Sequence, residues 1–98
     1  MTIEKTTNEG NAELKVSGRL DTTTAPQLET ELTPCLEDAT ELTLDFAKLE
    51  YISSAGLRVL LSAQKIMNKQ GKMALKNVNK TIMEVFEVTG FVDILTLE

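Results

Sequence analysis

The stretch that decides the fold is residues 51–61, which read Tyr-Ile-Ser-Ser-Ala-Gly-Leu-Arg-Val-Leu-Leu. An apolar, extended segment (residues 42–49) precedes it and a helical spacing of apolar residues follows it, so a strand passes into a helix here. Ser53 and Ser54 lie at the junction, where a helix exposes unpaired N–H groups and partial positive charge. A hydroxyl at this position either caps the helix or accepts a phosphate that those N–H groups stabilise.

Length and composition bound the class of protein. The 98 residues predict one domain, spanning 1–98, with a single core. Apolar residues are 42% and charged residues 26% of the chain, an ordinary globular balance. The net charge of −5 disfavours nucleic-acid binding, which needs a clustered basic surface. The chain has no apolar run of membrane-spanning length and no signal-like N-terminus, so we expect a cytoplasmic protein without membrane insertion.

Several catalytic chemistries lack their residues. The chain has no histidine, so it cannot build a Ser-His or Cys-His pair. Its one cysteine, Cys35, excludes an internal disulfide and makes a zinc site improbable. The five glycines are scattered and form no phosphate-binding loop. We therefore expect no enzyme activity, no cofactor and no metal site, and we expect Cys35 to be a core residue.

The first half of the chain predicts a hairpin followed by a helix. Residues 12–17 alternate apolar and polar, which is typical of a half-buried strand, and the turn before them makes 2–7 its partner. Thr24 and Gln27 form a capping-box pattern at the start of a helix. Pro34 lies inside that helical pattern, so the helix should kink or tighten near Thr33.

The second half alternates strands with helices. Its predicted elements are a strand at 41–46, a helix at 54–70 closed by Gly71, a strand at 72–76, a helix from the Asn79 cap to Gly90, and a strand at 94–97. The order β-β-α-β-α-β-α-β predicts an α/β fold with a mixed, mostly parallel sheet of about five strands and helices packed against it. Phe46 and Tyr51 are expected to be core or half-buried aromatics.

Three segments together resemble the STAS domain family, and in particular the bacterial anti-sigma factor antagonists. The first is Val-Ser-Gly-Arg-Leu-Asp at 16–21. The second is Leu-Asp-Phe at 44–46 followed by Tyr-Ile-Ser-Ser-Ala-Gly-Leu at 51–57. The third is Phe-Glu-Val-Thr-Gly-Phe at 86–91. They occur in the family's order and spacing, and the resemblance covers nearly the whole chain.

The resemblance implies a STAS-like fold and partner switching. Antagonists of this kind, when unphosphorylated, bind an anti-sigma factor that is usually also a serine kinase, and so release a sigma factor. Phosphorylation of a serine at the start of the second helix blocks that binding, and a PPM-type serine phosphatase restores it. Counted back from Gly56, the phosphoacceptor falls on Ser54. The partner-binding residues implied are Asp21, Thr22, Thr23, Thr24, Ser53, Ser54, Gly56 and Arg58.

The chain departs from the family pattern at three places. Ser53 stands where many relatives have an acidic residue, which makes it a competitor for the phosphate, although it is the better cap candidate. Ala55 replaces a second hydroxyl. The final helix of many relatives is not found within the 98 residues, which would leave some surface uncovered for a partner. Gly56 has two possible roles: it allows α-helix packing at close distance, or it leaves space for a partner to approach. The sequence is compatible with both.

The sequence is compatible with two other classes of function. One is an unphosphorylated STAS module, acting as a scaffold or as the small subunit of a lipid-transport or other signalling complex. The other is a small enzyme or nucleotide-binding domain, which the missing chemistry disfavours.

Overall fold

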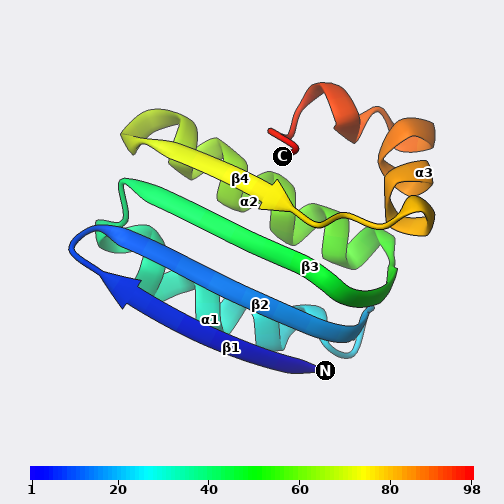
Figure 1. Ribbon diagram of the computed structural model, residues 1–98, viewed down its shortest axis with the longest axis horizontal. Coiled ribbons are helices and arrows are strands. Elements are labelled where there is room, and N and C mark those ends of the chain that lie inside the picture. The colour runs from blue at the N-terminus through cyan, green and yellow to red at the C-terminus, as the bar shows by residue number, and fades with distance from the viewer.

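The computed structural model describes residues 1–98 and is built on one four-stranded sheet (Figure 1). The strands β1 (Thr2–Asn8), β2 (Asn11–Leu20), β3 (Glu41–Ile52) and β4 (Lys72–Lys76) lie side by side in that order. The β1–β2 pair is antiparallel, whereas β2–β3 and β3–β4 are parallel. The predicted mixed, mostly parallel sheet is therefore confirmed, but it has four strands and not about five.

The strand predicted at 94–97 does not form. Helix α3 (Lys80–Thr89) is followed by the 3₁₀ turn η1 (Phe91–Asp93), and the carbonyl of Phe91 accepts from the N–H groups of Ile94 and Leu95. These local bonds occupy groups that a strand would direct to its neighbour. What remains of the predicted pairing is a single parallel bridge between Leu75 and Leu97.

Two long helices cover one face of the sheet. In Figure 1, α1 (Ala25–Asp38) and α2 (Ser54–Gln70) lie behind the strands, and no helix crosses the near face. The core between these layers includes Leu14, Phe46, Leu60 and Phe86, all at 0% exposure. Cys35 is buried on α1, as predicted. Helix α1 runs unbroken through Pro34.

Strand β3 is longer than predicted because two bulges interrupt its alternation. The ten residues of β2 pair with the twelve of β3, and the register shifts between Lys15 and Ser17 and again between Gly18 and Arg19. The buried apolar residues of β3 are consequently spaced by two and then by three (Leu42, Leu44, Phe46, Leu49, Ile52). An extra residue at each bulge breaks the period of two on which the prediction relied.

The predicted hairpin forms, with β1 one residue longer than predicted and β2 extending over Asn11–Leu20 in place of 12–17, and the predicted ends of α2, β4 and α3 are confirmed. Helix α2 spans 54–70 and β4 spans 72–76, as the sequence indicated. Asn79 caps α3 by accepting from the N–H of Ile82 at 2.9 Å, and Gly90 ends it at φ 82°, a left-handed conformation that glycine adopts readily. None of the three helices combines the length and apolarity needed to cross a membrane.

Candidate functional site

The two loops that carry the implied partner-binding residues meet at one end of the sheet. Leu20, the last residue of β2, pairs with Ile52, the last residue of β3. The N–H of Ser53 then donates to the carbonyl of Leu20 at 2.9 Å. We call this region, residues 21–24 and 53–58, the Ser54 end. Both α1 and α2 begin here, so their unpaired N–H groups and partial positive charge gather at the same place.

The carboxylate of Asp21 organises the first loop. Its Oδ1 accepts from the N–H groups of Thr23 and Thr24, at 3.0 and 3.1 Å, and from the Thr23 hydroxyl at 2.8 Å. The hydrogen bond from the Thr23 side chain is the main reason that the pKa of Asp21 lies below its usual value, since it favours the charged form. Asp21 therefore shapes this loop as an anion.

The capping box predicted from Thr24 and Gln27 is wrong. The hydroxyl of Thr24 makes no capping bond and donates to the carbonyl of Arg19 at 2.7 Å. The side chain of Gln27 donates to the carbonyl of Met1, at the open end of the hairpin, where β2 finishes. Asp21 Oδ1 binds N–H groups of the loop before the helix, and the main-chain carbonyl of Asp21 accepts from the N–H of Ala25 at 2.8 Å, so α1 begins without a side-chain cap.

The structure distinguishes the two serines. Ser54 is the first residue of α2 and is exposed. Ser53 is the N-cap residue by position, but its side chain makes no capping bond and its hydroxyl oxygen is buried without a hydrogen-bond partner. The predicted capping role of the Ser53 hydroxyl is therefore wrong, and Ser54 presents the accessible hydroxyl.

A shallow groove of about 240 Å³ joins the two loops beside Ser54. It runs between the first turns of α1 and α2 and includes Thr22, Pro26, Ala55 and Arg58 in its lining. Thr22 and Arg58 are both exposed, and they belong to different loops of the predicted partner surface. Of the predicted partner-binding residues, Thr22 and Arg58 thus line one groove at this end.

Gly56 differs from the other predicted residues because it is buried. A Cβ at this position would lie 2.7 Å from Cγ of Leu20 and 2.9 Å from Cγ1 of Ile52. The side of Gly56 that lacks a side chain therefore faces the core, where α2 approaches the ends of β2 and β3. Close packing of α2 against β2 and β3 therefore explains why a glycine is needed at this position. We do not include Gly56 in the contact surface proposed below.

Sequence reasoning missed Arg19 and misplaced Tyr51. Tyr51 is 39% exposed, against the expectation of a core or half-buried ring. The guanidinium carbon of Arg19 lies 4.2 Å from the centroid of that ring, and Nε of Arg19 lies 3.8 Å from Oδ2 of Asp21. The pairing depends on the second bulge of β3, which places Tyr51 opposite Arg19. Strict alternation gives no sign of it.

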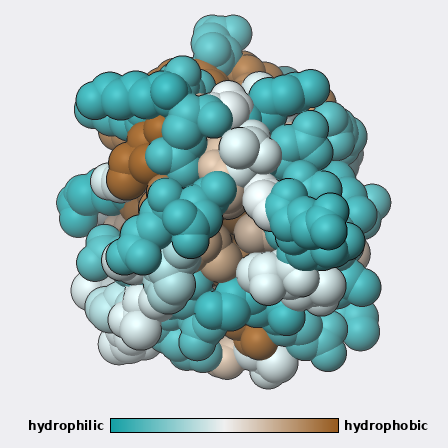
Figure 2. Space-filling model, turned by 90° about the vertical axis from the view of Figure 1, so that its left-hand side faces the viewer, coloured by the Kyte–Doolittle hydropathy of each residue, from teal (hydrophilic) through white to brown (hydrophobic).

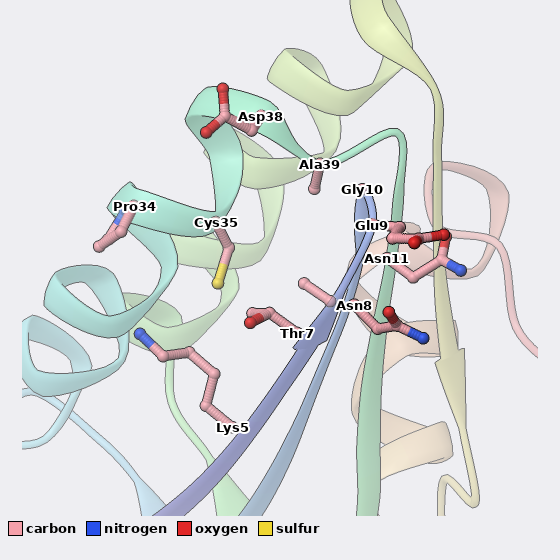
Figure 3. A pocket seen from close by; sticks show the side chains of 11 residues that line it. Lys5, Thr7, Asn8, Glu9, Gly10, Asn11, Pro34, Cys35, Asp38 and Ala39 are labelled. Atoms are coloured by element: carbon pink, nitrogen blue, oxygen red, sulfur yellow. The ribbon is translucent and has the colours of Figure 1, made fainter.

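A larger hollow, of about 450 Å³, lies at the opposite end of the sheet (Figure 3). Thr7 and Cys35 point toward one another there, between α1 and the β1–β2 hairpin, and the ammonium of Lys5 pairs with Glu31 of α1 at 3.3 Å. Burial raises the pKa of the Cys35 thiol, which lowers its reactivity. No group of three or more Cys, Asp and Glu side chains comes close enough to hold a metal ion.

These features define a small α/β domain with an exposed serine at a helix N-terminus. A family model described as STAS domain matches residues 2–98, and the chain belongs to that family. The anti-sigma-B factor antagonist of Staphylococcus aureus is 34% identical over 97 residues, covering 97% of this chain and 90% of the relative.

Solved structures share the fold. An anti-sigma factor antagonist from Mycobacterium paratuberculosis superposes with a TM-score of 0.88 at 24% identity, covering 98% of this chain and 83% of that one. The Bacillus cell fate determinant SpoIIAA in its phosphorylated form superposes with a TM-score of 0.77 at 17% identity, covering 99% and 91%. The predicted family and STAS-like fold are confirmed.

Proposed function

We propose that this protein is an anti-sigma factor antagonist that phosphorylation of Ser54 switches off. In the unphosphorylated form it binds an anti-sigma factor that is also a serine kinase, and a sigma factor is released. A PPM-type phosphatase restores the binding form. The observation that carries the proposal is the contrast between the exposed Ser54 hydroxyl and the buried Ser53 hydroxyl at the start of α2. The name of the Staphylococcus relative supports the function, and the cytoplasm is the location that it implies.

The fold is suited to carry a phosphate at Ser54. The first helical bond of α2 runs from the N–H of Leu57 to the carbonyl of Ser53, at 3.0 Å. The N–H groups of residues 54–56 precede that bond and have no partner within the helix. A phosphate at this point gains about 0.3–1 kcal/mol from the helix N-terminus, so phosphorylation should leave the melting temperature nearly unchanged.

The switch acts on a surface and not on the fold. A phosphate adds about −1.5 to −2 charges beside the groove between Thr22 and Arg58. Burying like charges together costs several kcal/mol, and each 1.4 kcal/mol is about tenfold in affinity. We expect the phosphoprotein to bind its kinase roughly a hundredfold more weakly, or worse.

The test begins with a pull-down from the native cytosol, read by mass spectrometry, to identify the kinase. The kinase and ATP are then used to phosphorylate the protein, and fragment-ion mass spectrometry maps the phosphate. Phosphate on Ser54 is expected, and phosphate confined to Ser53 or to a threonine would contradict the assignment. Recovery of transporter subunits, with no phosphate on the chain, would favour an unswitched STAS module instead.

Calorimetry with the identified kinase then tests the switch. Ser54→Ala should bind as tightly as the wild type but resist inactivation by ATP. Ser54→Asp should weaken binding less than the true phosphate, because it carries less charge. Equal affinities for the wild type and the phosphoprotein would overturn partner switching.

A further inference from the structure

The two arginines of the chain both lie around the Ser54 end. They are Arg19 and Arg58, and the other eight cations are lysines. The guanidinium of Arg19 lies over the ring of Tyr51 and beside Asp21. Arg58 lines the groove together with Thr22. Arginine differs from lysine in presenting a planar fork of donors that matches a carboxylate with two parallel hydrogen bonds.

Both guanidinium groups retain unused donors. Arg58 is exposed and takes part in none of the three ion pairs of the structure. Arg19 approaches Asp21 through Nε at 3.8 Å, which leaves its two terminal nitrogens outside any ion pair, and 62% of its side chain is exposed. The face of Tyr51 beneath it, together with Asp21, restricts where the fork can point. A preorganised, exposed arginine loses less freedom when it binds.

The character of the surface points to its partner. Arginine and tyrosine are the side chains most enriched among residues that dominate binding energy at interfaces. The chain as a whole carries −5, and Asp21 and Glu29 lie at this surface too. Arg58 nevertheless makes no ion pair with Glu29, and both guanidinium groups keep donors for a partner. A partner that binds the two arginines by charge must present acidic groups. A new phosphate at Ser54 would repel those same acidic groups.

We propose that Arg19, held over Tyr51, and Arg58 bind carboxylates of the kinase partner on either side of Ser54. This inference rests on the proposed function and adds the chemistry of the partner face, which is acidic. It also extends the contact surface from the groove between the helices to the pair on β2 and β3. Phosphorylation then opposes binding because the phosphate stands between the partner's carboxylates and the arginines that attract them.

Charge reversal with matched controls tests the proposal, using calorimetry with the kinase identified above. Arg19→Glu and Arg58→Glu should each lower the affinity about tenfold or more. Lys65→Glu and Lys69→Glu make the same change in net charge on exposed positions farther along α2, and they should change the affinity less than about twofold. Arg19→Lys keeps the charge but loses the fork, so an intermediate loss is expected.

A second readout separates recognition from structure. Thermal unfolding of the arginine variants should match the wild type, because both side chains are exposed. Tyr51→Leu removes the ring beneath Arg19 and should weaken binding while the protein stays folded. Equal losses from the arginine and lysine reversals would overturn the proposal, and so would tighter binding of Arg19→Glu or Arg58→Glu, because either result means that the partner does not present carboxylates to these two side chains.

The outcomes distinguish this inference from the switch itself. If the phosphoprotein binds as tightly as the wild type while both arginine reversals weaken binding, the switch fails and the arginine contacts stand. If phosphorylation abolishes binding while the arginine reversals are silent, the switch stands and this inference fails. If the unphosphorylated wild type binds no kinase, both fall together.

Discussion

The two ends of the sheet differ in ways that follow from its parallel strands. At the Ser54 end, α1 and α2 begin, and their N-termini favour negative charge. At the opposite end, which we call the hairpin end (residues 9–10, 39–40 and 71), both helices terminate and their partial charge is negative. The side of the molecule that holds this end presents mostly hydrophilic side chains (Figure 2).

The larger hollow is at the hairpin end, yet the chemistry favours the smaller groove. Asp38, at the C-terminus of α1, lies at that larger hollow (Figure 3). A phosphate there would meet Asp38 and helix C-termini as well as Lys5. At the Ser54 end it would meet unpaired N–H groups and Arg58 as well as Glu29, so the direction of the helices is what separates the two ends. The direction of the helices, and not cavity size, is therefore the reason that we place the proposed site at the Ser54 end.

Among the changes proposed here, substitution of Gly71 at the hairpin end should cause the largest loss of stability. A Cβ on Gly71 would lie 1.9 Å from the carbonyl oxygen of Thr40, and main-chain atoms cannot move aside cheaply. The adjacent bond from the N–H of Lys72 to that same carbonyl, at 2.9 Å, would be disturbed. We expect Gly71→Ala to lower the free energy of unfolding by about 2 kcal/mol, as overpacking typically does, in urea titrations.

The comparison requires that the folded fraction of Gly71→Ala still bind the kinase with unchanged affinity. A large loss of affinity after correction for the folded fraction would show that the hairpin end takes part in binding.

A carboxylate placed at each end sharpens the comparison. Thr22→Glu puts a negative charge in the groove beside Arg58 and should weaken kinase binding about tenfold, which is 1.4 kcal/mol. Thr7→Glu makes the same change at an exposed position of the hairpin-end hollow and serves as the control. Calorimetry on both variants measures the difference. If Thr22→Glu leaves the affinity for the kinase unchanged and Thr7→Glu weakens it, the docking surface lies at the hairpin end.

Removal of the Ser53 hydroxyl tests the contrast between the two serines. That oxygen is buried without a partner and makes no capping bond, so alanine removes a cost and loses nothing. We expect Ser53→Ala to raise the free energy of unfolding by about 1 kcal/mol in urea titrations, and to leave phosphorylation of Ser54 intact. A fall of similar size would mean that the hydroxyl caps α2 in solution.

Acid titration of Asp21 gives the smallest expected effect. Its pKa is lowered in the folded protein, so it contributes stability above its unfolded pKa of about 3.9, and that contribution disappears as the pH falls through the folded pKa. Asp21→Asn keeps an acceptor but loses the charge. Its melting temperature should be slightly below that of the wild type at neutral pH, and the two should converge in acid. A constant difference at every pH would show that the charge is not what stabilises the loop.

Elements with local end signals could be predicted from the sequence. Helix α2 and strand β4 have the predicted bounds because Gly71 marks their junction, and α3 has them because Asn79 and Gly90 are its cap and stop. Ser54 emerged from a resemblance over residues 51–57, and the structure adds its exposure.

The features that were missed depend on partners distant in sequence or on broken periodicity. The length of β3 and the position of Tyr51 follow from bulges that only the pairing with β2 reveals. Helix α1 begins without a side-chain cap, because the Thr24 hydroxyl donates to the carbonyl of Arg19 and the Asp21 carboxylate binds the loop before the helix. At 94–97 an alternating apolar pattern suits a strand, but the turn after Gly90 uses the same backbone groups locally.

Residues 96–98 pair with the outer edge of β4 only through the single bridge between Leu75 and Leu97, so they can detach from that edge easily. Two main-chain bonds hold this bridge, from the N–H of Leu75 to Thr96 at 2.9 Å and from the N–H of Glu98 to Leu75 at 2.8 Å. Because so few bonds must open, amide hydrogens here should exchange with solvent long before those of β2 and β3. Each opening uncovers a short strand edge, so the rate of this fraying sets how often the protein offers a template for aggregation.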